Sequence, residues 1–300
     1  MRIYFDSKAN RFRFKQSRDT FLVEEIPLFE PAAKGRFTIL KVRKKDISTW
    51  DMLDILSGYS NYKIGYAGLK DKNATAVQYL SIDSRDEKRF LKFKSKKIEI
   101  LDTFKSSQPI KIGDLKGNRF EIVLENVRDL EGIKKSLELI EKTGVPNYFG
   151  YQRFGNGSIS QAKAFVEGEY FTKNLRMQKM LVSIYQSDLF NRWLAKRVSM
   201  DKKGLKILEG DILRDGVPTG LLPGNRVRRA RGEAGRIERE FDEHIGAKGY
   251  RREALYFPKK LSLKESGKNL TLSFELPKGS YATTLLEHLA QKEMNYKGFG

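Results

Sequence analysis

The stretch "YAGLKDKNATAVQYLS" (residues 66–81) joins two apolar segments through a short polar one. The segments "YKIGYAGL" (62–69) and "VQYLSID" (77–83) are rich in aromatic and branched side chains, which predicts two strands. Residues 70–76 between them are polar and place Asp71 between two lysines. This stretch therefore predicts a strand, a loop that carries a carboxylate, and a second strand.

The residues before this stretch predict two more strands and a helix. "TFLVEEI" (20–26) and "RFTILKVRK" (36–44) have strand composition, and prolines and a glycine between them indicate a turn. "DISTWDMLDILSGYS" (46–60) has the helical period, with Ser48 and Asp51 as a capping box and Gly58 as the stop. The period predicts that Ile47, Trp50, Leu53 and Leu56 form its buried stripe.

The rest of the chain changes character at about residue 158. Residues 96–107 and 118–127 predict strands, and residues 130–144 predict an amphipathic helix that ends at Gly144. Helical patterns dominate residues 161–170, 175–199 and 234–249, and a stretch rich in glycine and arginine lies at 208–234. Strand patterns return at 251–263 and 269–280, before a last helix at 281–294. The order indicates a region of strands and helices, a helical insertion, and a return to the first region.

The composition narrows the possible chemistry. Lysine and arginine total 58 against 38 acidic residues, a net charge of +20, which favours an anionic partner such as nucleic acid over a merely solvated basic surface. The 300 residues contain no cysteine and two histidines, so disulfides, thiolate zinc sites and cysteine nucleophiles are excluded. Neither a P-loop nor a dinucleotide-binding glycine motif occurs. We therefore expect chemistry based on carboxylates, lysines and aromatic rings, with no metal, cofactor or bound nucleotide.

The distribution of apolar residues predicts the cellular location. No apolar run approaches the roughly 20 residues that span a bilayer, and the charged N-terminal stretch does not read as a signal peptide. We expect a cytoplasmic protein that does not contact membranes. No heptad pattern or dimer element stands out, which favours a monomer.

Three groups of residues are candidates for function, and each has a structural alternative. Asp71 is either a carboxylate held ionised by neighbouring cations or an ordinary turn residue. "NYFGYQRFG" (147–155) is either a platform for an unstacked base or a buried aromatic corner. The arginines at 226, 228, 229 and 231 either contact phosphates or belong to a solvated basic loop.

Five motifs, taken in order, resemble the TruD family of tRNA pseudouridine synthases over almost the whole chain. They are "FKQSRDTFLVEEIPLFEP" (14–31), "YAGLKDKNATAVQYLS" (66–81), "LKGNRFEIVLENV" (115–127), "VPNYFGYQRFGNGS" (145–158) and "FELPKGSYATTLLEHL" (274–289). The insertion is shorter than in longer members of the family, which leaves the details of the RNA contacts open.

The resemblance implies an α+β fold. Its catalytic domain has a mixed, largely antiparallel sheet with flanking helices, formed by residues 1–152 and 253–300. A mostly helical TRUD domain, residues 153–252, is inserted between these two parts.

The resemblance also implies a reaction and a set of site residues. The reaction is the isomerisation of uridine to pseudouridine, most often uridine 13 in the D arm of tRNA, without a cofactor. Asp71 matches the catalytic aspartate, and its supporting residues are Lys15, Glu25 and Lys70. The residues that match the substrate pocket are Phe149, Asn147, Phe21, Arg153 and Gln152, with Arg226, Arg228 and Arg229 expected on the RNA backbone.

Two other functions remain possible on sequence grounds. A non-catalytic RNA-binding or RNA-chaperone protein would use the charge and the aromatic rings but would not need Lys15, Asp71 and Phe149 together. A methyltransferase would need a glycine-rich cofactor loop, which is absent. If the chain is a pseudouridine synthase, Asp71 acts either as a nucleophile or as a base, and the sequence does not distinguish these routes.

Overall fold

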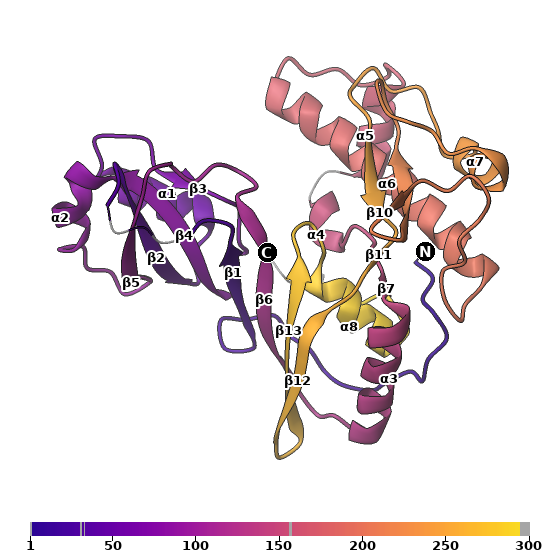
Figure 1. Ribbon diagram of the computed structural model, residues 1–300, viewed down its shortest axis with the longest axis horizontal. Coiled ribbons are helices and arrows are strands. Elements are labelled where there is room, and N and C mark those ends of the chain that lie inside the picture. Colours follow the sequence, from indigo (N-terminus) through magenta and orange to yellow (C-terminus); the bar gives the residue numbers. More distant parts are fainter. Residues whose placement is uncertain (1, 31, 33, 156–157, 295–300) are drawn as a thin grey trace. The chain divides into compact units, whose positions relative to one another are not determined.

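The computed structural model describes residues 2–30, 32, 34–155 and 158–294 (Figure 1). Their contacts divide the chain into two compact units. The sheet unit contains Arg11–Arg128 and Lys259–Gly279, and the helical unit contains residues 2–10, Asp129–Pro258 and residues 280–294. Each unit is described by itself below.

The sheet unit is built on one mixed, largely antiparallel sheet, which confirms the predicted fold class. Among the described residues its strands follow the order β12-β13-β6-β1-β4-β2-β5, with β3 paired to β4. Only the β1–β4 pair on this path is parallel. The strands are β1 (Phe21–Pro27), β2 (Phe37–Lys45), β3 (Gly65–Tyr66), β4 (Thr75–Asp83), β5 (Ile98–Ser106), β6 (Leu115–Leu124), β12 (Lys259–Ser266) and β13 (Asn269–Pro277).

The last strands of the chain complete this sheet. β12 and β13 form a hairpin, and β13 pairs with β6 from Leu270↔Leu124 to Pro277↔Gly117. Figure 1 shows this hairpin, in orange and yellow, beside the magenta β6. After the insertion the strands β12 and β13 therefore return to the sheet that the first part of the chain forms, whereas α8 (Ala282–Ala290) belongs to the helical unit.

Helix α1 (Thr49–Ser57) follows β2 and covers part of the sheet, with η1 (Ser84–Asp86) and α2 (Glu87–Phe90) after β4. Its predicted start is confirmed, because Ser48 caps it by accepting a hydrogen bond from the Asp51 N–H. Its predicted stripe is partly wrong: Trp50 is 56% exposed, while Met52 and Leu56 are fully buried. Met52 and Leu56 are four residues apart and share a face, whereas Trp50 is turned by about 200° from Met52.

The helical unit contains six helices among its described residues. They are α3 (Leu130–Thr143), α4 (Tyr151–Phe154), α5 (Ile159–Val166), α6 (Leu175–Met200), α7 (Gly232–Arg239) and α8 (Ala282–Ala290). The predicted end of α3 at Gly144 is confirmed, and this glycine has a φ of 72°. No helix of the described chain is both long enough and apolar enough to cross a membrane.

Two small sheets add to these helices. One has the order β10-β9-β8, and the other pairs β11 with β7. Their strands are β7 (Val145–Pro146), β8 (Leu213–Arg214), β9 (Val217–Leu222), β10 (Tyr250–Glu253) and β11 (Leu255–Tyr256). The stretch at 208–234 therefore contains the strands β8 and β9, which its glycine- and proline-rich composition does not predict.

The expected domain boundaries at residues 152 and 252 both lie within the helical unit. The compact units are defined by contacts between residues, and their limits need not coincide with the domain boundaries of the family. The boundaries of the inserted domain therefore stay a prediction.

Candidate active site

The acid loop, residues 68–72, lies in the connection between β3 and β4 and carries Asp71 at the surface of the sheet unit. Gln16 and Lys44 both contact Asp71 within this unit. Gln16 Nε2 donates to Asp71 Oδ2 at 3.2 Å, and Lys44 Nζ donates to the Asp71 carbonyl oxygen at 2.7 Å. The first contact orients the carboxylate, and the second fixes the main chain that carries it.

Buried polar side chains hold the rest of the acid loop. Gln78 Nε2 donates to the Gly68 carbonyl at 2.8 Å, and the Lys70 N–H donates to Thr49 Oγ1 at 2.9 Å. Thr49 Oγ1 in turn donates to Gln78 Oε1 at 2.9 Å. Such a connected set restricts the loop because breaking one bond leaves a buried polar group unsatisfied.

Glu25 and Lys70, both predicted to support the catalytic carboxylate, form an ion pair with each other. Lys70 Nζ lies 2.6 Å from Glu25 Oε1, and both side chains are buried. The other oxygen of Glu25 accepts the Tyr79 N–H at 3.0 Å. This pair therefore fastens the acid loop to β1 and β4.

Phe21 and Lys15 lie in different surroundings. Phe21 is buried, with its ring centroid 6.2 Å from that of Phe14 and 5.8 Å from that of Phe120. Lys15 is exposed, and the ion pairs formed by the described residues do not include it. The expected partnership of Lys15 with Asp71 stays a prediction.

The second candidate group lies in the helical unit, around Asn147. Its side-chain Nδ2 donates to the Glu253 carbonyl at 3.0 Å. Arg252 donates to Asn147 twice, from Nη2 to the side-chain oxygen at 2.6 Å and from Nε to the carbonyl oxygen at 3.0 Å. Asn147 is thus held on β10 by the half-buried Arg252.

Phe149 is surrounded by aromatic rings and cations. Its side chain is only 8% exposed, and its ring centroid lies 5.6 Å from that of Phe190. The guanidinium carbon of Arg252 lies 4.1 Å from the Phe149 centroid, within the range of a cation–π interaction. Asn191 accepts from the Phe149 N–H and donates to its carbonyl, so the main chain is fixed as well. Burial lowers the pKa of Arg252 to about 10, so this cation stays charged at neutral pH.

Gln152 and Arg153 come from the short helix α4. Gln152 is exposed, and Arg153 is half-buried with its guanidinium carbon 5.4 Å from the Phe149 centroid. Arg153 donates to Ser183 Oγ and, at 3.1 Å, to Ser187 Oγ, both on α6. Two cations therefore border the same aromatic ring, an environment suited to an electron-rich or anionic group.

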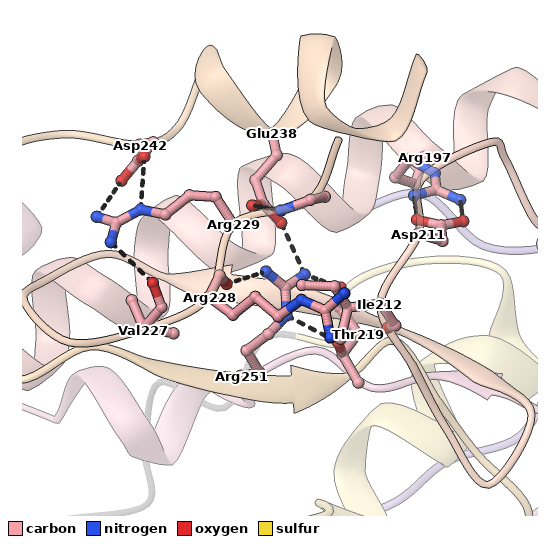
Figure 2. Close-up of polar contacts among 11 residues, drawn as sticks. Arg197, Asp211, Ile212, Thr219, Val227, Arg228, Arg229, Glu238, Asp242 and Arg251 are labelled. Carbon is pink, nitrogen blue, oxygen red and sulfur yellow. Dashed lines mark hydrogen bonds and ion pairs between the residues drawn. The ribbon is translucent and has the colours of Figure 1, made fainter. Parts of the chain in front are cut away.

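The arginine loop, residues 226–231, follows β9 and is fixed by a buried ion pair (Figure 2). Arg251 donates to the Arg228 carbonyl at 3.0 Å, to Thr219 Oγ1 at 2.8 Å and to Glu238 Oε2 at 2.7 Å. The other oxygen of Glu238 accepts the Ala230 N–H at 2.8 Å. The main chain of the loop is therefore fixed from two sides.

The three arginines predicted to contact RNA differ in their surroundings. Arg229 pairs with Asp242 at 3.1 Å and donates to the Val227 carbonyl at 2.9 Å (Figure 2). Arg226 and Arg228 are exposed, and neither side chain joins an ion pair within the described part of the chain. Arg229 therefore contributes to the shape of the loop, and the other two point their charge to solvent.

A metal site does not emerge from the described residues, since these contain no group of three histidine, aspartate or glutamate side chains placed to hold an ion. Sequence reasoning missed Gln16, Lys44 and Arg252. The alternation of β2 could have identified Lys44, because Leu40, Val42 and Lys44 lie on one face of the strand. The pattern therefore places a lysine where an apolar residue is expected. Arg252 had no such signal, because its partners are distant in sequence.

Comparison with known proteins places these features in context. A family model described as tRNA pseudouridine synthase D (TruD) matches residues 1–174 and 213–289. The chain is 39% identical to tRNA pseudouridine synthase D of a Nitratiruptor species, with 98% of this chain and 99% of the relative aligned. It is 36% identical to the protein of that name from Wolinella succinogenes, with the same coverage.

A solved structure gives the same result. The crystal structure of a candidate tRNA pseudouridine synthase D from Methanosarcina mazei superposes with a TM-score of 0.74 and 25% identity, covering 96% of this chain and 95% of the other. The alignment with the Nitratiruptor protein spans 355 positions, more than the 300 residues of this chain, so the relative contains segments that are absent here.

Proposed function

This chain belongs to the family of tRNA pseudouridine synthase D, and on that premise we propose that it isomerises uridine to pseudouridine in tRNA, with uridine 13 of the D arm as its target. The observation that carries the proposal is the acid loop. A carboxylate stands at the surface on a loop whose main chain is fixed by buried polar groups. Loops that are both exposed and fixed in this way are suited to catalysis.

The reaction breaks the N1–C1′ bond of uridine and forms a C5–C1′ bond. The proton on C5 is lost and N1 gains one, so the atoms balance without a cofactor. In the proposed mechanism Asp71 acts in its ionised form, either by attacking the sugar carbon or by accepting a proton from the sugar. Gln16 donates to this carboxylate and would keep one oxygen oriented in both routes.

The target nucleotide must leave its stack before it reacts, which costs a few kcal/mol and is offset by contacts in a pocket. We assign this role to Phe149, whose main chain is fixed by Asn191. The supporting contacts would come from Asn147, Phe21, Gln152 and Arg153. Lys15 would then serve as a cation for the bound RNA or for Asp71.

The arginine loop is our candidate for contact with the RNA backbone. Arg226 and Arg228 present exposed charge on a fixed main chain, and each phosphate contact would release counterions. The net charge of +20 would attract tRNA at a distance.

The experiment is incubation of the protein with an unmodified tRNA transcript and no cofactor, followed by chemical mapping of pseudouridine. We expect product at one uridine and none in a transcript in which cytidine replaces uridine 13. Asp71→Asn should abolish product, whereas Asp54→Asn, which removes the same charge from an exposed position of α1, should not. Binding of tRNA without any product would instead support the non-catalytic RNA-binding function.

A further inference from the structure

Lys44 is a buried cation directly beneath the acid loop. Its side chain is 0% exposed, although β2 places it in line with the apolar Leu40 and Val42. Nζ donates to the Ile47 carbonyl at 2.6 Å and to the Asp71 carbonyl at 2.7 Å. One ammonium thus joins three segments: the strand β2, the turn before α1, and the acid loop.

Burying a lysine at this position of β2 costs folding free energy. An ammonium loses its hydration when it is buried, and burial is the largest cause that lowers the pKa of Lys44, to about 8. The charged groups that act on it are Asp71 and Asp51, which raise the pKa, and Lys70, which lowers it. A leucine or valine would fill this strand position without that cost. The side chain therefore provides something that an apolar residue cannot.

What it provides is a bond to the main chain of one particular residue. Gln78 and Thr49 fix the acid loop at Gly68 and Lys70, which both precede the carboxylate. Without Lys44 the carbonyl of Asp71 would lose its bond to β2, and the bonds from Gln78 and Thr49 do not act on that carbonyl.

We propose that Lys44 is a positioning residue: its ammonium fixes the main chain of Asp71 so that the carboxylate is presented in one place. This inference rests on the proposed function, since it explains how that carboxylate is oriented. Displacement of a reacting group by about 1 Å can cost about 100-fold in rate. Loss of Lys44 should therefore affect turnover more than RNA binding.

The test compares Lys44→Met with Lys41→Met. Lys41 lies on the same strand but on its other face, where it pairs with Glu24 at 2.7 Å. In Lys44→Met we expect kcat to fall about 10- to 100-fold while KM for tRNA changes less than about 2-fold. Lys41→Met should keep both constants within about 2-fold of the wild type.

Amide hydrogen exchange provides a readout that needs no turnover. Peptides that cover residues 68–72 should exchange about 10-fold faster in Lys44→Met, while peptides of β4 and β6 keep their wild-type rates. If the methionine variant does not fold, Lys44→Gln, which keeps an N–H donor on a shorter side chain, should show the same changes to a smaller extent.

The outcomes separate the two proposals. Unchanged exchange of the acid loop, or equal changes in kcat and KM, would overturn the role of Lys44. A wild-type protein that makes no pseudouridine would refute the proposed function, and the exchange measurement would still decide whether Lys44 fixes the loop.

Discussion

Replacing Glu238 by alanine should weaken tRNA binding, even though the change makes the protein more positive. Glu238 is buried, with a side chain 3% exposed, and it holds both Arg251 and the Ala230 N–H. Without it, Arg251 keeps a buried charge with no counterion, and the arginine loop loses its bond at Ala230. Breaking such a buried pair costs about 3–5 kcal/mol of folding stability.

The chain offers a closely matched control in Asp211. Its carboxylate, 2% exposed, accepts from the buried Arg197 (Figure 2). It also accepts from the Leu208 N–H, so it has the same kinds of partner as Glu238. Asp211→Ala should therefore lose a similar amount of stability and gain the same charge. It leaves the bonds to Arg228 and Ala230 intact.

The expected difference is in affinity. Ordering one freed loop residue on binding costs about 1–2 kcal/mol, which corresponds to a Kd about 10-fold higher for Glu238→Ala than for Asp211→Ala. The assay is fluorescence anisotropy with labelled tRNA at low temperature, corrected for the folded fraction from circular dichroism. Where the alanine variants unfold, Glu238→Gln and Asp211→Asn replace them.

Equal affinity of the two variants would refute the reasoning, because it would mean that the fixed shape of the arginine loop does not contribute to binding. Tighter binding by both would indicate that net charge alone governs the interaction with tRNA.

Three further results should follow. The free energy of unfolding should fall by up to about 3 kcal/mol as the pH is lowered from about 6.5 to 4. Burial lowers the pKa of His288 to about 4, so over this range the unfolded chain binds more protons than the folded one. In urea titrations His288→Phe should remove this loss, and a variant that loses stability as the wild type does would contradict the prediction. Gly220→Ala should lower the melting temperature through a loss of about 1–3 kcal/mol of folding stability, because the added Cβ would lie 2.3 Å from the Trp193 ring. A wild-type melting temperature would show that the ring can move. Replacing Arg226 and Arg228 with alanine should reduce the slope of log K against log salt by about 1.5, and a wild-type slope would exclude both from the interface.

The sequence predicted those features of the fold that depend on neighbouring residues. The cap at Ser48 and the glycine end of α3 were found because each acts within one helical turn. Trp50 was misplaced because a large apolar residue was assumed to be buried, whereas it lies at the surface edge-on to Tyr66, with ring centroids 5.7 Å apart.

The candidate site was predicted less completely, for a physical reason. Asp71, Glu25 and Lys70 stand in recognisable motifs, but the pairing of Glu25 with Lys70 depends on the parallel contact of β1 with β4. Arg252 reaches Asn147 only because the chain returns after more than a hundred residues. Hydrogen bonds between distant segments leave no periodic signal in a sequence.

The pairing of β13 with β6 has a consequence for biosynthesis. The ribosome completes β6 at Leu124, but its partner residues, Leu270 to Pro277, are made only after the whole of Asp129–Pro258. Until then the backbone groups on one side of β6 are exposed, and an open strand edge of this kind promotes association between nascent chains. Such long-range pairing also slows folding, because a large loop must close before the last strands can join. Weaker induction, which lowers the number of nascent chains present at one time, should therefore raise the yield of native protein more than it does for a protein whose sheet forms from consecutive strands.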